Sequence, residues 1–112
     1  VHVAIEAAKK AAKRGIEAEI IDLRTILPFD AQTCIDSVRR TGRLIVLQEA
    51  QYTGGLGHTV SSRILEEAFW NLENAPVVIG ALDTPVPFSP PLEDHTIPTS
   101  DLVVRHIRRM CE

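Results

Sequence analysis

Two short runs of consecutive apolar residues constrain the fold of this chain more than any other feature. They are Leu44–Leu47 and Val77–Leu82, and a segment with helical spacing of apolar side chains precedes each of them. Unbroken apolar runs of this length are typical of strands that helices cover on both faces. Because two parallel strands need a crossover between them, this alternation predicts an α/β protein with a parallel sheet.

The rest of the chain supplies the other elements of this order. We predict a further strand at Ala18–Leu23 and a stiff, extended loop between Pro85 and Pro98, which holds five of the seven prolines. Helices are predicted over residues 2–14, 30–41, 100–110 and from the glycine-rich turn at 53–57 to Asn74. The order α-β-α-β-α-β-loop-α predicts a three-layer α/β/α fold with a mostly parallel sheet.

Periodicity also predicts which side chains form the core. The apolar stripes of the four helices are Val1, Ile5, Ala8 and Ala12, then Cys34, Ile35 and Val38, then Val60, Ile64, Leu65, Ala68 and Leu72, and finally Leu102, Val103, His106, Ile107 and Met110. Asp30 is expected to cap the second helix, and Gly15 and Gly42 to end the first and second. Since the first helix needs a sheet to cover and only three strands are visible, we expect a strand before Val1 to be missing.

Composition excludes several classes of protein. A chain of 112 residues has the size of one domain, and its 12 basic against 15 acidic side chains argue against nucleic acid as a partner. No apolar run approaches the roughly 18–20 residues of a membrane span, so no membrane partner is expected. Cys34 and Cys111 are isolated, which indicates neither a disulfide framework nor a zinc site. We therefore expect a reducing compartment, either a bacterial cytoplasm or a mitochondrial matrix.

The glycine-rich turn is the first candidate binding site. Gly54, Gly55 and Gly57 lie between a strand and a helix, where backbone N–H groups can bind an anion, and Asp83 follows about one βαβ unit later. However, Val60 stands where a dinucleotide-binding fingerprint has its third glycine. We therefore favour a tight turn that sets the entry of the helix, with a free-standing nucleotide- or anion-binding module as the alternative.

No arrangement of residues typical of catalysis or metal binding is found. The four histidines lie on different elements, and of these only His58, in the glycine-rich turn, is placed like a site residue. Neither cysteine pairs with a nearby histidine in the arrangement of a catalytic nucleophile, and no GxSxG motif occurs. We assign no catalytic, cofactor-binding or metal-binding residue to this chain.

Three stretches in fixed order resemble one known family. They are IDLRTILPFD (Ile21–Asp30), LIVLQEAQYTGGLG (Leu44–Gly57) and TPVPFSPPLEDHTIP (Thr84–Pro98). Together they resemble the C-terminal, transketolase-like domain of the β subunit of thiamine-diphosphate-dependent 2-oxo acid dehydrogenases, the decarboxylating components of pyruvate, branched-chain 2-oxo acid and acetoin dehydrogenase complexes. The resemblance covers residues 1–112 and implies an N-terminally truncated domain whose first strand and neighbouring pyrimidine-binding domain are absent.

The resemblance also implies what the domain does. In that family the N-terminal domain carries the catalytic histidine and the residues that touch the cofactor, and thiamine diphosphate and Mg²⁺ belong to the parent heterotetramer, so none of these residues is expected here. The C-terminal domain supports assembly of an α2β2 heterotetramer, with an α subunit and a second β subunit, and helps to dock the lipoyl-bearing acyltransferase core. The equivalent domain of deoxyxylulose phosphate synthase or transketolase is a related alternative, and PVPFSPPLED favours the pyruvate and acetoin branch.

Ten residues are the resulting interface and docking candidates. Arg24 is expected near a subunit interface or in a salt bridge with Asp22 or Asp30, and Glu73 either docks a basic acyltransferase domain or is a solvated helix end. Phe88 and Leu92, on the proline-rich loop, are expected to be buried by a partner subunit or domain. The remaining candidates are Glu49, Gly54, Gly55, Gly57, His58 and Glu112.

Overall fold

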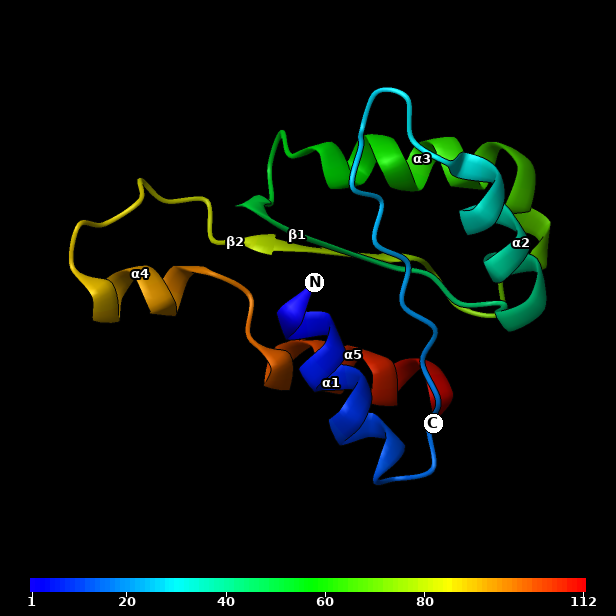
Figure 1. Cartoon of the computed structure of the whole chain (residues 1–112), viewed down its shortest axis with the longest axis horizontal. Helices are drawn as coiled ribbons and strands as arrows, with labels where there is room; N and C mark the ends of the chain where they lie inside the picture. Colours follow the sequence, from blue (N-terminus) through cyan, green and yellow to red (C-terminus); the bar gives the residue numbers. More distant parts are fainter.

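The computed structural model describes all 112 residues and has helices on both sides of a small parallel sheet (Figure 1). In chain order its elements are α1 (His2–Ala12), α2 (Ala31–Thr41), β1 (Ile45–Gln51), α3 (Leu56–Ala68), the 3-10 turn η1 (Phe69–Asn71), β2 (Val77–Ala81), α4 (Pro90–Thr96) and α5 (Ser100–Cys111).

The two continuous apolar runs form the sheet, as predicted. β1 and β2 are parallel, with Ile45 opposite Val77 and Leu47 opposite Ile79, and the register shifts after Leu47. Alternate side chains point to opposite faces of the pleated sheet. Ile45, Leu47, Val77 and Ile79 pack with α1 and α5, whereas Val46 packs with α2 and α3. The predicted three-layer α/β/α arrangement is confirmed.

The prediction of a further strand at Ala18–Leu23 is wrong. This segment makes no backbone ladder with either strand, although Ile21 and Leu23 pack against the α2/α3 cluster. Glu19 also connects this segment to α2, because its carboxylate accepts hydrogen bonds from Ser37 Oγ at 3.0 Å and from Arg40 at 2.8 Å. Alternating apolar residues are enough to hold an extended segment against a core, but a strand also needs a neighbouring backbone to pair with.

Helix boundaries follow the expected caps. Asp30 accepts the Thr33 N–H at 3.1 Å and the Thr33 hydroxyl at 2.5 Å, and these two hydrogen bonds hold the pKa of Asp30 below its ordinary value. Gly42 ends α2 with φ 70°. Gly15, at φ 78°, follows α1, where the Gly15 and Ile16 N–H groups bond to the Ala12 and Ala11 carbonyls in the pattern of a Schellman motif.

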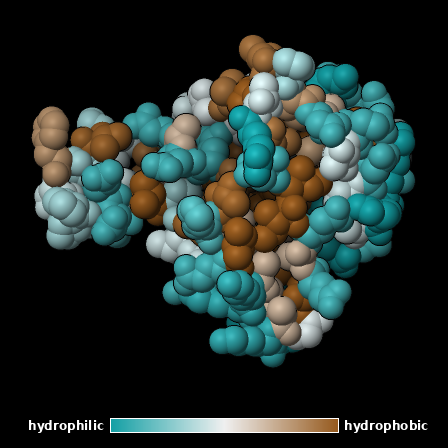
Figure 2. Space-filling model, in the orientation of Figure 1, coloured by the Kyte–Doolittle hydropathy of each residue, from teal (hydrophilic) through white to brown (hydrophobic).

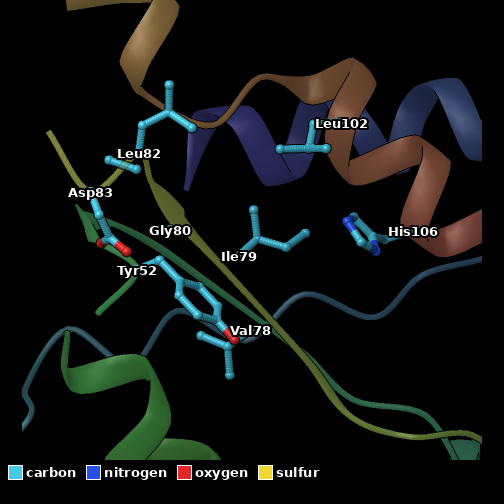
Figure 3. A pocket seen from close by; sticks show the side chains of 9 residues that line it. Tyr52, Val78, Ile79, Gly80, Leu82, Asp83, Leu102 and His106 are labelled. Carbon is cyan, nitrogen blue, oxygen red and sulfur yellow. The ribbon is translucent and has the colours of Figure 1, made fainter. Parts of the chain in front are cut away.

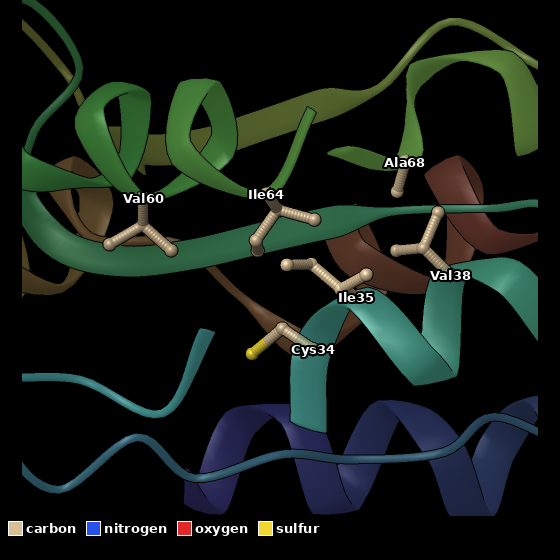
Figure 4. Packing of buried hydrophobic residues seen from close by; sticks show 6 residues of the cluster. All are labelled: Cys34, Ile35, Val38, Val60, Ile64 and Ala68. Atoms are coloured by element: carbon tan, nitrogen blue, oxygen red, sulfur yellow. The ribbon is translucent and has the colours of Figure 1, made fainter. Parts of the chain in front are cut away.

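Figure 4 shows the larger of two core clusters, in which the side chains of α2 and α3 meet. It contains Cys34, Ile35, Val38, Val60, Ile64 and Ala68, all from the predicted stripes. The prediction for α1 named the wrong side of the helix as buried. Ala7 and Ala11 are fully buried, whereas Ile5 is exposed. α1 packs against α5, and the small alanine side chains allow the two helices to approach closely.

Two other predictions need correction. The proline-rich loop is not extended throughout, because Pro90–Thr96 forms α4 after the flanking Ser89. Proline fits the first helical turn, where its missing N–H would have no partner. α3 ends at Ala68 rather than near Asn74, since the next three residues tighten into η1. None of the helices combines the length and the apolar character that a membrane crossing requires.

Candidate functional site

The glycine-rich turn lies at the edge of the sheet where both parallel strands end. β1 leads directly into residues 52–55, and β2 leads into Leu82 and Asp83. The Tyr52 N–H bonds to the Ala81 carbonyl at 2.9 Å, which extends the pairing of the two strands to this edge. In open α/β sheets ligands bind at this carboxyl edge.

Asp83 fastens the turn to the end of β2. Its carboxylate accepts hydrogen bonds from the Thr53 N–H at 2.8 Å and from the Thr53 hydroxyl at 2.6 Å. Both hydrogen bonds lower the pKa of Asp83, and the bond from the Thr53 hydroxyl has the larger effect. The carboxylate at the end of β2 is therefore engaged with the turn itself.

Gln48 fills the space beneath the glycines, a role that the sequence analysis missed. Its Oε1 accepts a hydrogen bond from the Gly57 N–H, and its Nε2 donates to the Gln51 carbonyl at 2.8 Å. A β-carbon at Gly57 would lie 2.6 Å from Gln48 Oε1, and one at Gly80 would lie 2.9 Å from Gln48 Nε2. Gln48 therefore accepts the hydrogen bond of a backbone N–H in the first turn of α3. The absence of side chains at Gly57 and Gly80 leaves the space that Gln48 fills.

These contacts support the interpretation of a tight turn rather than a nucleotide site. The Gly57 N–H, which an anion would need, already has a partner in Gln48. Val60, at the position of the missing third glycine, is buried in the α2/α3 cluster. In the sequence, Gln48 is marked only by its position three residues before the end of β1. That position does not predict a hydrogen bond with Gly57, nine residues later.

His58 also takes part in the turn. Its Nε2 lies 2.9 Å from the Tyr52 carbonyl oxygen, and its ring meets the Tyr52 ring edge to face with 4.6 Å between centroids. Glu49 lies exposed near the same edge of the sheet. The structure therefore brings together five sequence candidates, and these are Glu49, Gly54, Gly55, Gly57 and His58.

A depression of about 270 Å³ adjoins the turn between β2 and α5 (Figure 3). Most of its lining is apolar, including Val78, Ile79 and Leu102, and Tyr52 and His106 contribute rings. Burial, and then the charges of Arg109 and Arg105, lower the pKa of His106. The neutral imidazole is therefore favoured at pH 7. The structure holds no group of three or more His, Cys, Asp or Glu side chains placed to bind a metal ion.

The other candidates lie apart from the turn. Arg24 pairs with Asp22 at 3.8 Å, one of the two partners predicted. Glu73 follows η1 and precedes β2, at the opposite edge of the sheet. Its side chain is solvated, as one of the two predictions had it, and its carboxylate pairs with Arg43 at 3.0 Å. Glu112 pairs with Arg108 at 3.1 Å, one turn back along α5.

Phe88 and Leu92 project from the body of the protein. They belong to an arm, residues 85–96, that includes α4 and protrudes at the left of Figure 2. Phe88 is fully exposed, and Val86 and Leu92 are 69% and 58% exposed. One backbone hydrogen bond, from the Leu82 N–H to the Thr96 carbonyl, ties the two ends of the arm together.

Comparison with known proteins identifies similar chains. Residues 1–103 match the family described as "Transketolase, C-terminal domain". The chain is 43% identical to the acetoin:2,6-dichlorophenolindophenol oxidoreductase subunit beta of Cupriavidus necator over 109 residues, which are 97% of this chain and 32% of that protein. It is 35% identical to the pyruvate dehydrogenase E1 component subunit beta of Rickettsia bellii over 111 residues, which are 99% of this chain and 34% of that protein.

A plant relative is similar over the same region. The pyruvate dehydrogenase E1 component subunit beta-4, chloroplastic, of Oryza sativa subsp. japonica is 33% identical over 109 residues, which are 96% of this chain and 27% of that protein. The chain therefore spans about a third of the length of the curated relatives it matches.

Proposed function

The chain belongs to the transketolase C-terminal domain family, and from this premise we propose that it is the assembly and docking domain of a 2-oxo acid dehydrogenase β subunit. The parent enzyme would decarboxylate a 2-oxo acid and transfer the acyl group to a lipoyl group. Its partners would be an α subunit and a second β subunit, in an α2β2 heterotetramer, and a lipoyl-bearing acyltransferase core. The similarity to a pyruvate dehydrogenase subunit and to an acetoin oxidoreductase subunit favours pyruvate or acetoin as the parent substrate.

We also propose how residues 1–112 relate to the parent subunit. They form one domain, to which a pyrimidine-binding domain and a first strand are joined in the parent chain. The open, two-stranded sheet supports this, since it is smaller than most sheets. The compartment proposed for the parent enzyme is a bacterial cytoplasm or a mitochondrial matrix, and a chloroplast is the compartment named for one relative.

The residues of this chain form no metal site for the Mg²⁺ that accompanies thiamine diphosphate. A Mg²⁺ ion requires several oxygen ligands in near-octahedral geometry, and no cluster of carboxylates is available for it. Asp83, the acid at the glycine-rich turn, is engaged by Thr53. We therefore assign the cofactor to other parts of the parent enzyme, and to this chain the task of packing and docking.

The exposed arm carries this proposal. Monomeric proteins rarely leave several large apolar side chains together in solvent, and such groups mark surfaces that a partner covers. Val86, Phe88 and Leu92 lie exposed on one short arm. Prolines at positions 85, 87, 90 and 91 restrict the backbone of the arm, so that binding costs little conformational entropy. We propose that another subunit or domain of the parent enzyme buries this arm.

We expect Phe88→Ala to weaken subunit assembly. Full burial of a phenylalanine side chain is worth about 1.5–3 kcal/mol, which corresponds to a roughly 10- to 150-fold increase in the dissociation constant of the subunits. The measurement is analytical ultracentrifugation of the full-length β subunit with its α subunit. Because Phe88 is already exposed, the same substitution should leave the melting temperature of the isolated chain unchanged.

Arg39→Ala is the control for this experiment. Arg39 is an exposed side chain on α2, outside the arm, and it is not one of the exposed large apolar residues. It should leave the dissociation constant unchanged. Equal effects of the two substitutions, or equal solvent labelling of the arm in the isolated chain and in the assembled enzyme, would contradict burial of the arm.

The isolated chain should have no decarboxylase activity. With thiamine diphosphate and Mg²⁺ added, we expect release of CO₂ from pyruvate by the purified 112 residues to equal the rate without protein, since no group of side chains is placed to hold the metal ion. The full-length α and β subunits provide the positive control. Turnover by the isolated chain above that background would overturn the assignment of chemistry to the rest of the enzyme.

A further inference from the structure

The basic charge of the chain is concentrated on two adjacent helices. Residues 1–14 and 100–112, which include α1 and α5, contain seven Lys and Arg and three Asp and Glu. Residues 15–99 contain five basic and twelve acidic side chains. α1 and α5 pack against each other on one face of the sheet. The molecule therefore has a basic layer, and the remainder of the chain is acidic.

All three carboxylates of these two helices take part in ion pairs. Lys10 Nζ lies 3.0 Å from the Glu6 carboxylate and 2.7 Å from that of Asp101, which joins α1 to α5. Glu112 pairs with Arg108 within α5. Since residues 1–14 and 100–112 hold seven cations and three carboxylates, four positive charges remain in excess on this layer.

Five cations form what we call the basic face, and they are Lys9, Lys13, Arg14, Arg105 and Arg109. All five are exposed, and none has a carboxylate within 4.0 Å. Four-residue spacing places both members of each pair, Lys9 with Lys13 and Arg105 with Arg109, on the same side of its helix.

That side points away from the core. On α1 the buried residues are Ala7 and Ala11, and on α5 they include Val103. At 3.6 residues per turn, Lys9 and Arg105 each follow a buried residue by two positions, which is more than half a turn. The effect of Arg109 and Arg105 on the pKa of His106 agrees with a positive potential along α5.

We propose that the basic face docks an acidic helix of a partner protein. Residues four apart on a helix lie about 5–6 Å from each other, so carboxylates one turn apart on a partner helix match the spacing within either cation pair. Nucleic acid fits less well, because the acidic remainder of the chain repels a long polyanion. A membrane surface also fits less well, since neither helix has an aromatic residue beside its cations to enter the lipid.

The probe is a pair of synthetic peptides, and the experiment does not depend on the proposed function. One is a helical, alanine-based peptide of ~20 residues with Glu at every fourth position, and the other has Gln at the same positions. Fluorescence anisotropy with the 112-residue chain should detect binding of the Glu peptide at ~50 mM salt, and loss of binding at ~300 mM, where exposed charges are screened. The Gln peptide should not bind.

Two double variants with the same change in net charge test whether the Glu peptide binds at the basic face. Lys9→Glu/Arg109→Glu should weaken binding of the Glu peptide by about tenfold or more, because it places like charges opposite the ligand. Arg24→Glu/Arg39→Glu changes exposed arginines outside the basic face and should weaken it by less than about threefold. Far-UV circular dichroism shows whether each variant is folded, and Lys13→Gln/Arg105→Gln replaces the first variant if it is not.

Three results would overturn the proposal. The first is an equal loss of affinity in both double variants, which would mean that only net charge matters. The second is equal binding of the Gln peptide. The third is tighter binding of a single-stranded oligonucleotide, or of phosphatidylserine–phosphatidylcholine vesicles, than of the Glu peptide at equal concentration of charge.

Discussion

Replacing Ile64 by alanine is expected to destabilise the isolated chain by about 2–5 kcal/mol, as removal of a large buried side chain does in other proteins. Ile64 is 1% exposed and points from α3 toward Ile35 of α2 (Figure 4). The cavity that alanine leaves would lie where the two helices meet over the sheet. Since small domains are stable by only about 5–15 kcal/mol, a large part of the free energy of unfolding would be lost. Urea unfolding followed by circular dichroism measures this change.

Ile5→Ala provides the matched control. It removes the same atoms from α1, where Ile5 is 38% exposed and the buried positions are Ala7 and Ala11. We expect a loss below about 1 kcal/mol in the free energy of unfolding, because little area leaves the core. If the two substitutions have the same effect, the packing of α2 against α3 is not what holds this layer together.

The second large effect is expected at Gly55. Alanine here should destabilise the chain by about 1–3 kcal/mol, the range found for overpacked sites. Its β-carbon would overlap Gln48 Nε2 and lie 2.6 Å from the Gln51 carbonyl oxygen, and a backbone atom cannot move aside as a flexible side chain can. The free energy of unfolding, measured by urea titration, reports the difference.

Gly54→Ala separates crowding from backbone strain. Gly54 has φ +75°, but nothing lies within 4 Å of a β-carbon built there. Its substitution should therefore cost only the strain of a left-handed residue, about 1–2 kcal/mol. Truncating Gln48 in the same background should reduce the cost of Gly55→Ala and leave that of Gly54→Ala unchanged. Failure of Gln48→Ala to distinguish the two glycines would mean that Gln48 does not fill the turn.

The candidate site was predicted from the sequence only in part. The position of the glycine-rich turn between a strand and a helix was correct, because turn residues and apolar runs are local signals. The hydrogen bonds of Gln48 with Gly57 and of Asp83 with Thr53 were missed. Each depends on how β1, β2 and α3 are placed, and an isolated Gln or Asp carries no pattern that names its partner.

Glu73 illustrates the same difference among the charged candidates. The sequence offered a solvated helix end or a docking residue, and the structure adds an ion pair with Arg43, thirty positions earlier in the chain. Arg43 also donates to the Met110 carbonyl at 2.8 Å, so it links the start of β1 to the end of α5. An ion pair between exposed side chains contributes little stability, but it fixes where the Glu73 carboxylate lies.

The sequence by itself determined the α/β class, the two parallel strands, the caps of α2 and most of the core, because these follow from periodicity and from residues that act on their immediate neighbours. Only the tertiary structure decided that Ala18–Leu23 lies unpaired, that α1 buries Ala7 and Ala11, and that α4 forms on an exposed arm. Strand pairing and helix packing depend on what another segment presents. The spacing of apolar residues in one segment carries no information about that neighbour.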